Sequence, residues 1–158
     1  MIVKEIRDED FTSYKKPSMV IGFPSCTFKC ERECGCKGMC QNFALTTAPD
    51  IKIHVRAVVQ RYRINPITSA VICAGLEPFD SWEDLWLFVK HFRCHSDDDI
   101  VIFTGYNKEE ICDKVKLLSC YKNIIIKYGR FIPNQQPHYD PILGVKLASD
   151  NQYAERIS

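Results

Sequence analysis

The chain has 158 residues, of which 21 are Lys or Arg and 20 are Asp or Glu, so its net charge is +1. This length fits one domain with its own core, and the balanced charge gives no electrostatic reason to expect binding to nucleic acid or to an anionic membrane. The first ten residues lack the apolar core of a signal peptide, and no later stretch approaches the roughly 18 apolar residues of a membrane span. We therefore expect a single domain over residues 1–158, located in the cytoplasm.

Strand and helix patterns alternate along most of the chain. Four apolar runs are predicted as buried strands, at residues 19–24, 68–73, 99–104 and 123–128. Apolar residues recur at helical spacing between them, over residues 51–62, 85–92 and 111–118. Ser81 with Asp84 resembles a capping signal, and Asn107 is a predicted N-cap. Residues 129–141 are predicted to be extended and rich in turns, and a short apolar stretch follows at 142–147.

This alternation predicts an α/β fold. Parallel strands need right-handed helical crossovers, and the functional loops of such sheets gather at the carboxyl ends of the strands. We therefore expect any site to lie where the predicted strands end.

Nine cysteines are distributed unevenly along the chain. Five crowd into the fifteen positions from Cys26 to Cys40, and the other four stand singly at positions 73, 94, 112 and 120. Because cytosolic thiols are kept reduced, such a cluster indicates a metal site rather than a disulfide framework. The four single cysteines are interpreted as packing residues, since free cysteine behaves as a small buried hydrophobe.

The cysteine loop offers more thiolates than one tetrahedral metal ion needs, at Cys26, Cys30, Cys34, Cys36 and Cys40. Thiolates suit zinc and iron-sulfur clusters equally well. The paired Cys-x2-Cys repeat and the nearby histidine that are typical of zinc fingers are missing, which favours an iron-sulfur cluster.

Several separated motifs resemble the radical S-adenosylmethionine (radical SAM) enzymes, and within them the activating proteins of anaerobic ribonucleoside-triphosphate reductases. That family places a Cys-x3-Cys-x2-Cys loop after its first strand. Cys26-x3-Cys30 matches the start of this pattern, and Cys40-Gln41-Asn42 resembles its close. Nine residues rather than two separate Cys30 from Cys40, which we interpret as an insertion that resembles a divergent branch of these activases.

Further motifs follow the later strands. Gly75-Leu76-Glu77-Pro78 resembles the family's Gly-Gly-Glu-Pro element, which binds the methionine amino group of the cofactor, although Leu76 replaces one glycine. The segment 103–106 resembles the Thr-Gly-Tyr strand end of the activases, and segments 129–131 and 149–152 resemble their closing motifs. Tyr128 stands where the activases usually have Asp.

The resemblance implies a small, incomplete radical-SAM-type β/α barrel with a parallel sheet, which carries a cluster loop at residues 26–42. It implies a 4Fe-4S cluster held by Cys26, Cys30 and Cys40, with Cys36 and then Cys34 as alternates for the third ligand. S-adenosylmethionine would chelate the remaining iron. The predicted cofactor-binding residues are Gln41, Asn42, Gly75, Leu76, Glu77, Pro78 and Thr104.

The implied activity is reductive cleavage of S-adenosylmethionine to generate a glycyl radical on an anaerobic ribonucleoside-triphosphate reductase, with no catalytic side chain beyond the cluster and the cofactor. The implied partners are that glycyl-radical enzyme and an electron donor such as flavodoxin. Two alternatives remain open. One is a non-catalytic zinc or iron-sulfur interaction module, and the other is a radical SAM enzyme that acts on a small molecule.

Overall fold

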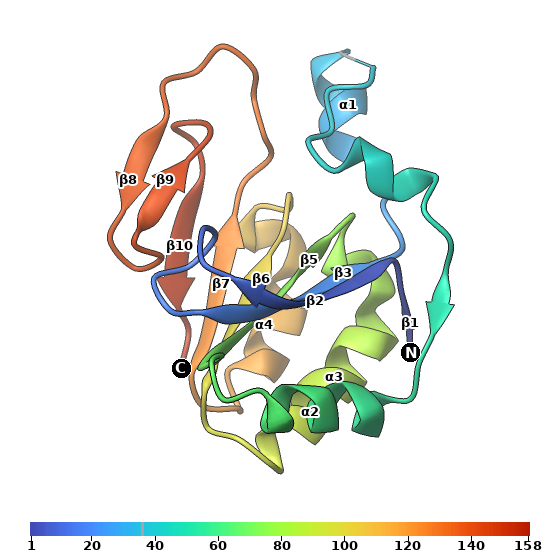
Figure 1. Cartoon of the computed structure of the whole chain (residues 1–158). Coiled ribbons are helices and arrows are strands. Elements are labelled where there is room, and N and C mark those ends of the chain that lie inside the picture. The colour runs from blue at the N-terminus through green and yellow to red at the C-terminus, as the bar shows by residue number, and fades with distance from the viewer. Residues whose placement is uncertain (36) are drawn as a thin grey trace.

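The computed structural model describes residues 1–35 and 37–158 and is built around a six-stranded sheet with the strand order β10-β7-β6-β5-β3-β2 (Figure 1). Its strands are β2 (Glu5–Asp10), β3 (Ser18–Phe23), β5 (Ala70–Gly75), β6 (Asp99–Phe103), β7 (Ile124–Tyr128) and β10 (Tyr153–Arg156). Two small antiparallel ladders pair β1 (Ile2–Val3) with β4 (Ile51–Lys52), and β8 (His138–Asp140) with β9 (Val145–Leu147). The helices are α1 (Lys29–Cys34), α2 (Val55–Ile64), α3 (Trp82–Arg93) and α4 (Cys112–Leu118), with 3-10 turns η1 (Phe43–Thr46), η2 (Pro78–Ser81) and η3 (Lys108–Ile111).

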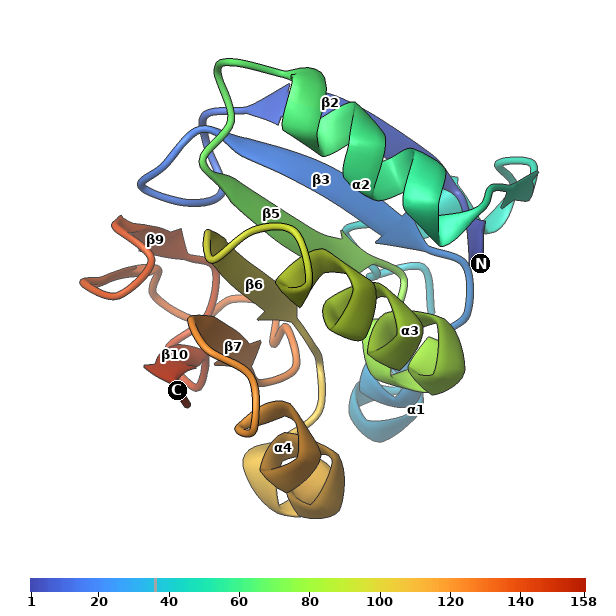
Figure 2. The same ribbon diagram turned by 90° about the horizontal axis from the view of Figure 1, so that it is seen from below.

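The four predicted strands are confirmed to within two residues, and they pair in parallel in chain order, β3-β5-β6-β7. Because each right-handed crossover moves the chain in the same direction, its helix is placed on the same face of the sheet. Figure 2 shows α2, α3 and α4 together on that face. The predicted α/β class is therefore confirmed. The described strands form an open sheet and not a closed barrel. Its two edge strands, β2 and β10, pair antiparallel with their neighbours, and neither was predicted from the sequence.

The inner strands are buried on both faces, which explains their unbroken apolar runs. On one face, residues such as Ile21 and Ile102 pack with the helices. On the other face, Ile72 and Ile125 pack with Leu143 and Leu147 of the chain after β7. This arrangement leaves the carboxyl ends of the parallel strands to be covered by the cysteine loop (Figure 1).

The helix predicted to start at residue 51 begins four residues later, at Val55. Ile51 instead lies in β4, which pairs with β1, and the backbone N–H of Ile53 donates to Met1 O at 3.1 Å. His54 then caps the helix, because its Nδ1 accepts from Arg56 N at 3.2 Å. A pairing partner more than 45 residues away in sequence thus overrides the local helical pattern.

Both predicted N-cap residues stand directly before a helical segment, but only Asn107 belongs to a capping box. Asn107 and Glu110 form the reciprocal bonds of a capping box at the start of η3. The Ser81 side chain makes no cap hydrogen bond, and Asp84 accepts instead from Ile2 N at 2.8 Å. The Asp84 side chain therefore joins α3 to the start of the chain rather than closing the cap of α3.

The single cysteines divide into one buried and three exposed residues. Cys73 is fully buried in β5, as its packing interpretation requires. Cys94, Cys112 and Cys120 are exposed, so that interpretation is wrong for them. All three lie at ends of α3 or α4, where the helices meet the surface.

Candidate metal centre

The cysteine loop lies above the carboxyl ends of the parallel strands (Figure 1). Backbone hydrogen bonds join its first residues to the end of β5, since Leu76 N donates to Phe23 O at 3.1 Å and Glu77 N donates to Ser25 O at 2.8 Å. Gly75 has a φ of 93°, and a Cβ at this position would lie 2.6 Å from Phe23 N. The close approach of the two strand ends therefore requires glycine at position 75.

The described cysteines of the loop differ in burial and surroundings. Cys26, Cys30 and Cys40 are half-buried, whereas Cys34 is exposed. Cys30 lines two hollows, the smaller one together with Cys26 and the larger one together with Cys40, while Cys34 lines neither. Cys36, the other alternate ligand, lies outside the described residues. Cys30 thus shares one hollow with Cys26 and the other with Cys40.

The half-buried cysteines supply donors that suit an iron-sulfur cluster. Within residues 1–35 and 37–158, no group of three or more His, Cys, Asp or Glu side chains converges as a mononuclear site requires. The cysteines of an iron-sulfur cluster bind different irons of a larger body and need not meet at one point. Three half-buried thiols along two hollows suit that arrangement.

The electrostatics of the loop favour protonated thiols in the metal-free chain. Burial raises the pKa of Cys26 to about 12, and the charges of Glu77 and Asp80 add to this effect. Burial also raises the pKa of Cys30, to which the neighbouring Cys40 contributes. A bound metal centre reverses this balance by its positive charge, so its binding releases protons from the thiols.

Glu77 joins the ends of β5 and β6. The residue is 5% exposed, and its carboxylate accepts hydrogen bonds from Phe79 N at 3.1 Å, Thr104 Oγ1 at 2.8 Å and Gly105 N at 2.9 Å. Burial raises the pKa of Glu77 to about 7, although these hydrogen bonds oppose the shift. The sequence prediction placed Glu77 at the cofactor and missed this internal role, which depends on donors from another strand.

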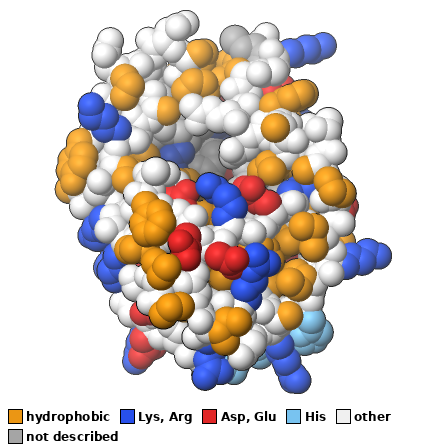
Figure 3. Space-filling model, viewed as in Figure 1, with side chains coloured by type: hydrophobic (Ala, Val, Ile, Leu, Met, Phe, Trp, Pro, Cys, Tyr) orange, Lys and Arg blue, Asp and Glu red, His pale blue; other side chains and the backbone are white. Residues whose placement is uncertain are grey.

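The larger hollow has a cavity volume of about 160 Å³ and opens to solvent. Figure 3 shows a hollow on the face in view, with hydrophobic side chains and charges of both signs around it. The predicted cofactor residues in the lining of the larger hollow are Gln41, Asn42, Gly75, Leu76 and Thr104.

The cysteine loop is tied to this hollow directly, because Asn42 Nδ2 donates to Gly75 O at 2.6 Å. The two other predicted cofactor residues lie outside the lining of the larger hollow. Glu77 lines the smaller hollow, and Pro78 is buried at the start of η2.

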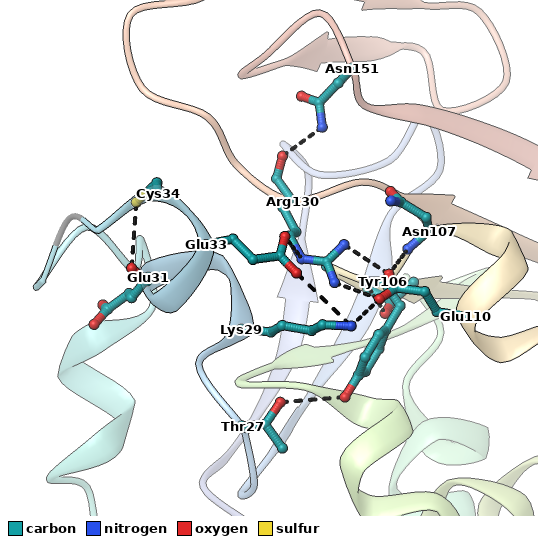
Figure 4. A network of polar contacts seen from close by, with 12 residues as sticks. Thr27, Lys29, Glu31, Glu33, Cys34, Tyr106, Asn107, Glu110, Arg130 and Asn151 are labelled. Carbon is teal, nitrogen blue, oxygen red and sulfur yellow. Dashed lines mark hydrogen bonds and ion pairs between the residues drawn. The ribbon is translucent and has the colours of Figure 1, made fainter.

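An ion network joins α1 to the sheet, and sequence reasoning did not find it (Figure 4). Arg130, which is 8% exposed, donates from Nη1 and Nη2 to the two carboxylate oxygens of Glu110 at 2.8 and 2.7 Å. Lys29 also contacts Glu110, and Glu33 Oε2 lies 2.9 Å from Arg130 Nε without the geometry of a hydrogen bond. The hydrogen bonds from Arg130 hold the pKa of Glu110 down at about 2. The sequence identifies segment 129–131 as a motif, but the acidic side chains that contact Arg130 come from two other elements, α1 and η3.

The two closing motifs contact each other in the structure. Gln152 Nε2 donates to Gly129 O at 3.2 Å, and Asn151 Nδ2 donates to Arg130 O at 2.9 Å. Gly129 has a φ of 97°, and a Cβ there would lie 2.9 Å from Asn151 O. The C-terminal segment therefore holds Arg130 at the edge of the site.

A cysteine loop above the carboxyl ends of a parallel sheet, with its thiols spread along a hollow, defines an α/β protein with an iron-sulfur centre. Residues 19–152 match the family model described as a 4Fe-4S single cluster domain. The chain therefore belongs to this family, and the predicted 4Fe-4S cluster is confirmed as its cofactor. No curated protein and no solved structure matches the chain. None of the described helices is long and apolar enough to cross a membrane.

Proposed function

We propose that this chain is a radical SAM activase, which cleaves S-adenosylmethionine reductively at its 4Fe-4S cluster and generates a glycyl radical on an anaerobic ribonucleoside-triphosphate reductase. The observation that carries the proposal is that Gln41, Asn42, Gly75, Leu76 and Thr104 line one hollow together with Cys30 and Cys40. The strand order supports it as well. Parallel strands that follow each other in chain order, with their helices on one face, are the winding of a β/α barrel. An open sheet of this winding suits an incomplete radical-SAM-type barrel.

In this proposal Cys26, Cys30 and Cys40 hold the cluster and leave one iron open. An open coordination position is what separates a catalytic metal site from a closed structural one. Cys40 is preferred as the third ligand because it is half-buried and lines the larger hollow, whereas Cys34 is exposed. When bound, the cluster and S-adenosylmethionine supply the one-electron chemistry that removes a hydrogen atom from a glycine.

The strand ends position the cofactor. A backbone carbonyl has two acceptor sites, so Gly75 O can accept from a methionyl ammonium while it accepts from Asn42. Thr104 donates its hydroxyl to Glu77, which fixes the orientation of the β6 end beside β5. The chain thus supplies orientation and burial for the cofactor.

The proposed substrate is a glycine of another protein, which must approach the face that carries the cysteine loop. An electron donor such as flavodoxin is acidic and would be attracted by basic side chains near the cluster. Lys29 is paired with Glu110, whereas Arg32 and Lys37 are exposed within the loop. We therefore assign the attraction of an acidic donor to Arg32 and Lys37.

Anaerobic electron paramagnetic resonance tests the proposal. The reconstituted, dithionite-reduced protein is measured with and without S-adenosylmethionine, for the wild type and for separate alanine variants of the five loop cysteines. We expect a four-iron signal that changes with the cofactor and is lost in the Cys26, Cys30 and Cys40 variants only. With the reductase added, we expect a glycyl radical signal.

Other results would support the alternatives. Bound zinc with no response to S-adenosylmethionine would support the closed interaction module. Cleavage of the cofactor without any radical on the reductase would support a small-molecule substrate.

A further inference from the structure

Lys127 is a buried lysine in the wall of the larger hollow, and it belongs to none of the motifs that resemble the activases. It lies on β7 between Phe103 of β6 and Ala154 of β10, so its backbone is held from both sides. Its neighbours Ile126 and Tyr128 pack with the helices. Because successive side chains of a strand point to opposite faces, Lys127 points to the face away from the helices.

Lys127 is 9% exposed, and its ammonium has fewer hydrogen-bond partners than donors. Its ammonium donates to Gly129 O at 3.2 Å, and within residues 1–35 and 37–158 no Asp or Glu lies within ion-pair distance of it. An ammonium carries three donors, so two of them have no protein partner in the described chain. Burial lowers the pKa of Lys127 to about 8, although the negative charge of Glu77 opposes this. An unpaired buried charge costs stability, and such a cost is typical of a functional site.

We propose that Lys127 binds a carboxylate of the ligand that occupies the larger hollow. Lys127 is the only charged side chain among the described residues of the lining, and one cation matches a monoanion rather than a phosphate. The identity of the ligand rests on the function proposed above, where the carboxylate is that of the methionyl group of S-adenosylmethionine. The other wall of the hollow presents neutral groups, Asn42 and the backbone at Gly75. In this arrangement the methionyl ammonium of the ligand binds at the end of β5.

The test measures binding by anaerobic calorimetry on the reconstituted protein. The probes are S-adenosylmethionine, its decarboxylated analogue and L-methionine. Lys127→Met keeps the apolar length of the side chain without its charge, and Lys122→Met, at an exposed position, is the matched control. We expect Lys127→Met to bind S-adenosylmethionine about tenfold more weakly or worse, because a charged hydrogen bond is lost. It should bind the decarboxylated analogue as the wild type does, and it should melt at a higher temperature because the buried charge is gone.

Four results separate this proposal from its alternatives. An unchanged affinity of Lys127→Met for S-adenosylmethionine, or an equal loss of affinity for both S-adenosylmethionine and the analogue, would overturn the carboxylate site. If the wild type binds L-methionine through Lys127 but not S-adenosylmethionine, the carboxylate site stands and the proposed function falls. If the wild type binds none of the three probes, both are overturned.

Discussion

Two buried carboxylates stand at opposite ends of the neighbouring strands β5 and β6, and their surroundings differ. Asp99, at the start of β6, accepts from Lys16, from Arg156 Nη2 at 2.9 Å and from the Tyr14 hydroxyl at 2.9 Å. Glu77, just after β5, accepts from two backbone amides and a threonine hydroxyl. Burial would raise both pKa values, but the partners of Asp99 outweigh it and lower that pKa, whereas the pKa of Glu77 rises to about 7.

The two ends of the sheet differ in whether the chain itself supplies ion-pair partners for the buried charges. At the amino end, the cations needed to neutralise Asp99 come from the chain itself. At the carboxyl end, Glu77 and Lys127 are both buried without an ion pair in the described part of the chain. Substitutions at the amino end should therefore change stability alone, and those at the carboxyl end should also change ligand binding.

The largest effect is expected for Asp99→Asn. Removing one partner of a buried ion network costs about 3–5 kcal/mol, and we expect about 2–3 kcal/mol here because Lys16 and Arg156 are partly exposed. Urea unfolding followed by tryptophan fluorescence measures the change, with Asp150→Asn as an exposed control. Cluster content and cofactor binding should be unchanged, and a loss of either would contradict the separation of the two ends.

The same substitution predicts a pH dependence. Because the pKa of Asp99 is below its ordinary value of 3.8, its contribution to stability is complete above that value and is lost as the pH falls through the pKa of the folded state. The stability difference between the wild type and Asp99→Asn should therefore be constant near neutral pH and shrink below about pH 4. A difference that grows on acidification would contradict the assigned charge state.

Glu77→Ala should cost about 2 kcal/mol of stability and also abolish cofactor binding. The change leaves the donors of Phe79, Thr104 and Gly105 without their acceptor, at about 1–3 kcal/mol for each unsatisfied group. Water that enters the hollow reduces this cost. Calorimetry with S-adenosylmethionine and urea unfolding measure the two effects, and Glu9→Ala provides an exposed control. If Glu77→Ala binds S-adenosylmethionine normally, the ends of β5 and β6 do not need the Glu77 carboxylate to hold their positions.

Arg130→Lys should loosen the cysteine loop with a smaller effect on global stability. None of the described residues of α1 is buried, so the helix is held mainly by polar contacts. Lysine cannot reproduce the bidentate contact with Glu110. We expect a loss of about 1 kcal/mol or less in unfolding free energy, but several-fold faster proteolysis within residues 26–42 and faster release of iron to a chelator. Arg63→Lys, at an exposed position of α2, should change neither rate.

The smallest effects are expected at the exposed single cysteines. Serine at position 94, 112 or 120 should change stability by about 0.5 kcal/mol or less, as surface substitutions do. Cys73→Ser should cost about 1–3 kcal/mol, because it buries a hydroxyl in an apolar strand. Iron content should stay constant in all four variants, and a loss of iron in any of them would add that cysteine to the metal centre.

The sequence by itself determined the four parallel strands, the helices between them and the kind of cofactor. Strand and helix periodicities are local, and the buried runs of β3, β5, β6 and β7 carry no competing signal. The crowding of the loop cysteines is also local, and the match over residues 19–152 confirms the cluster that it predicted.

Only the tertiary structure decided which residues meet across the chain. The edge strands β2 and β10 have charged sequences that become strands because the parallel sheet offers them free edges. The pairing of Arg130 with Glu110 and the exposure of Cys94 depend on how the elements pack. The burial of Lys127 without a counterion also depends on tertiary packing. The partners of a charge are set by distances in space and not by spacing in sequence.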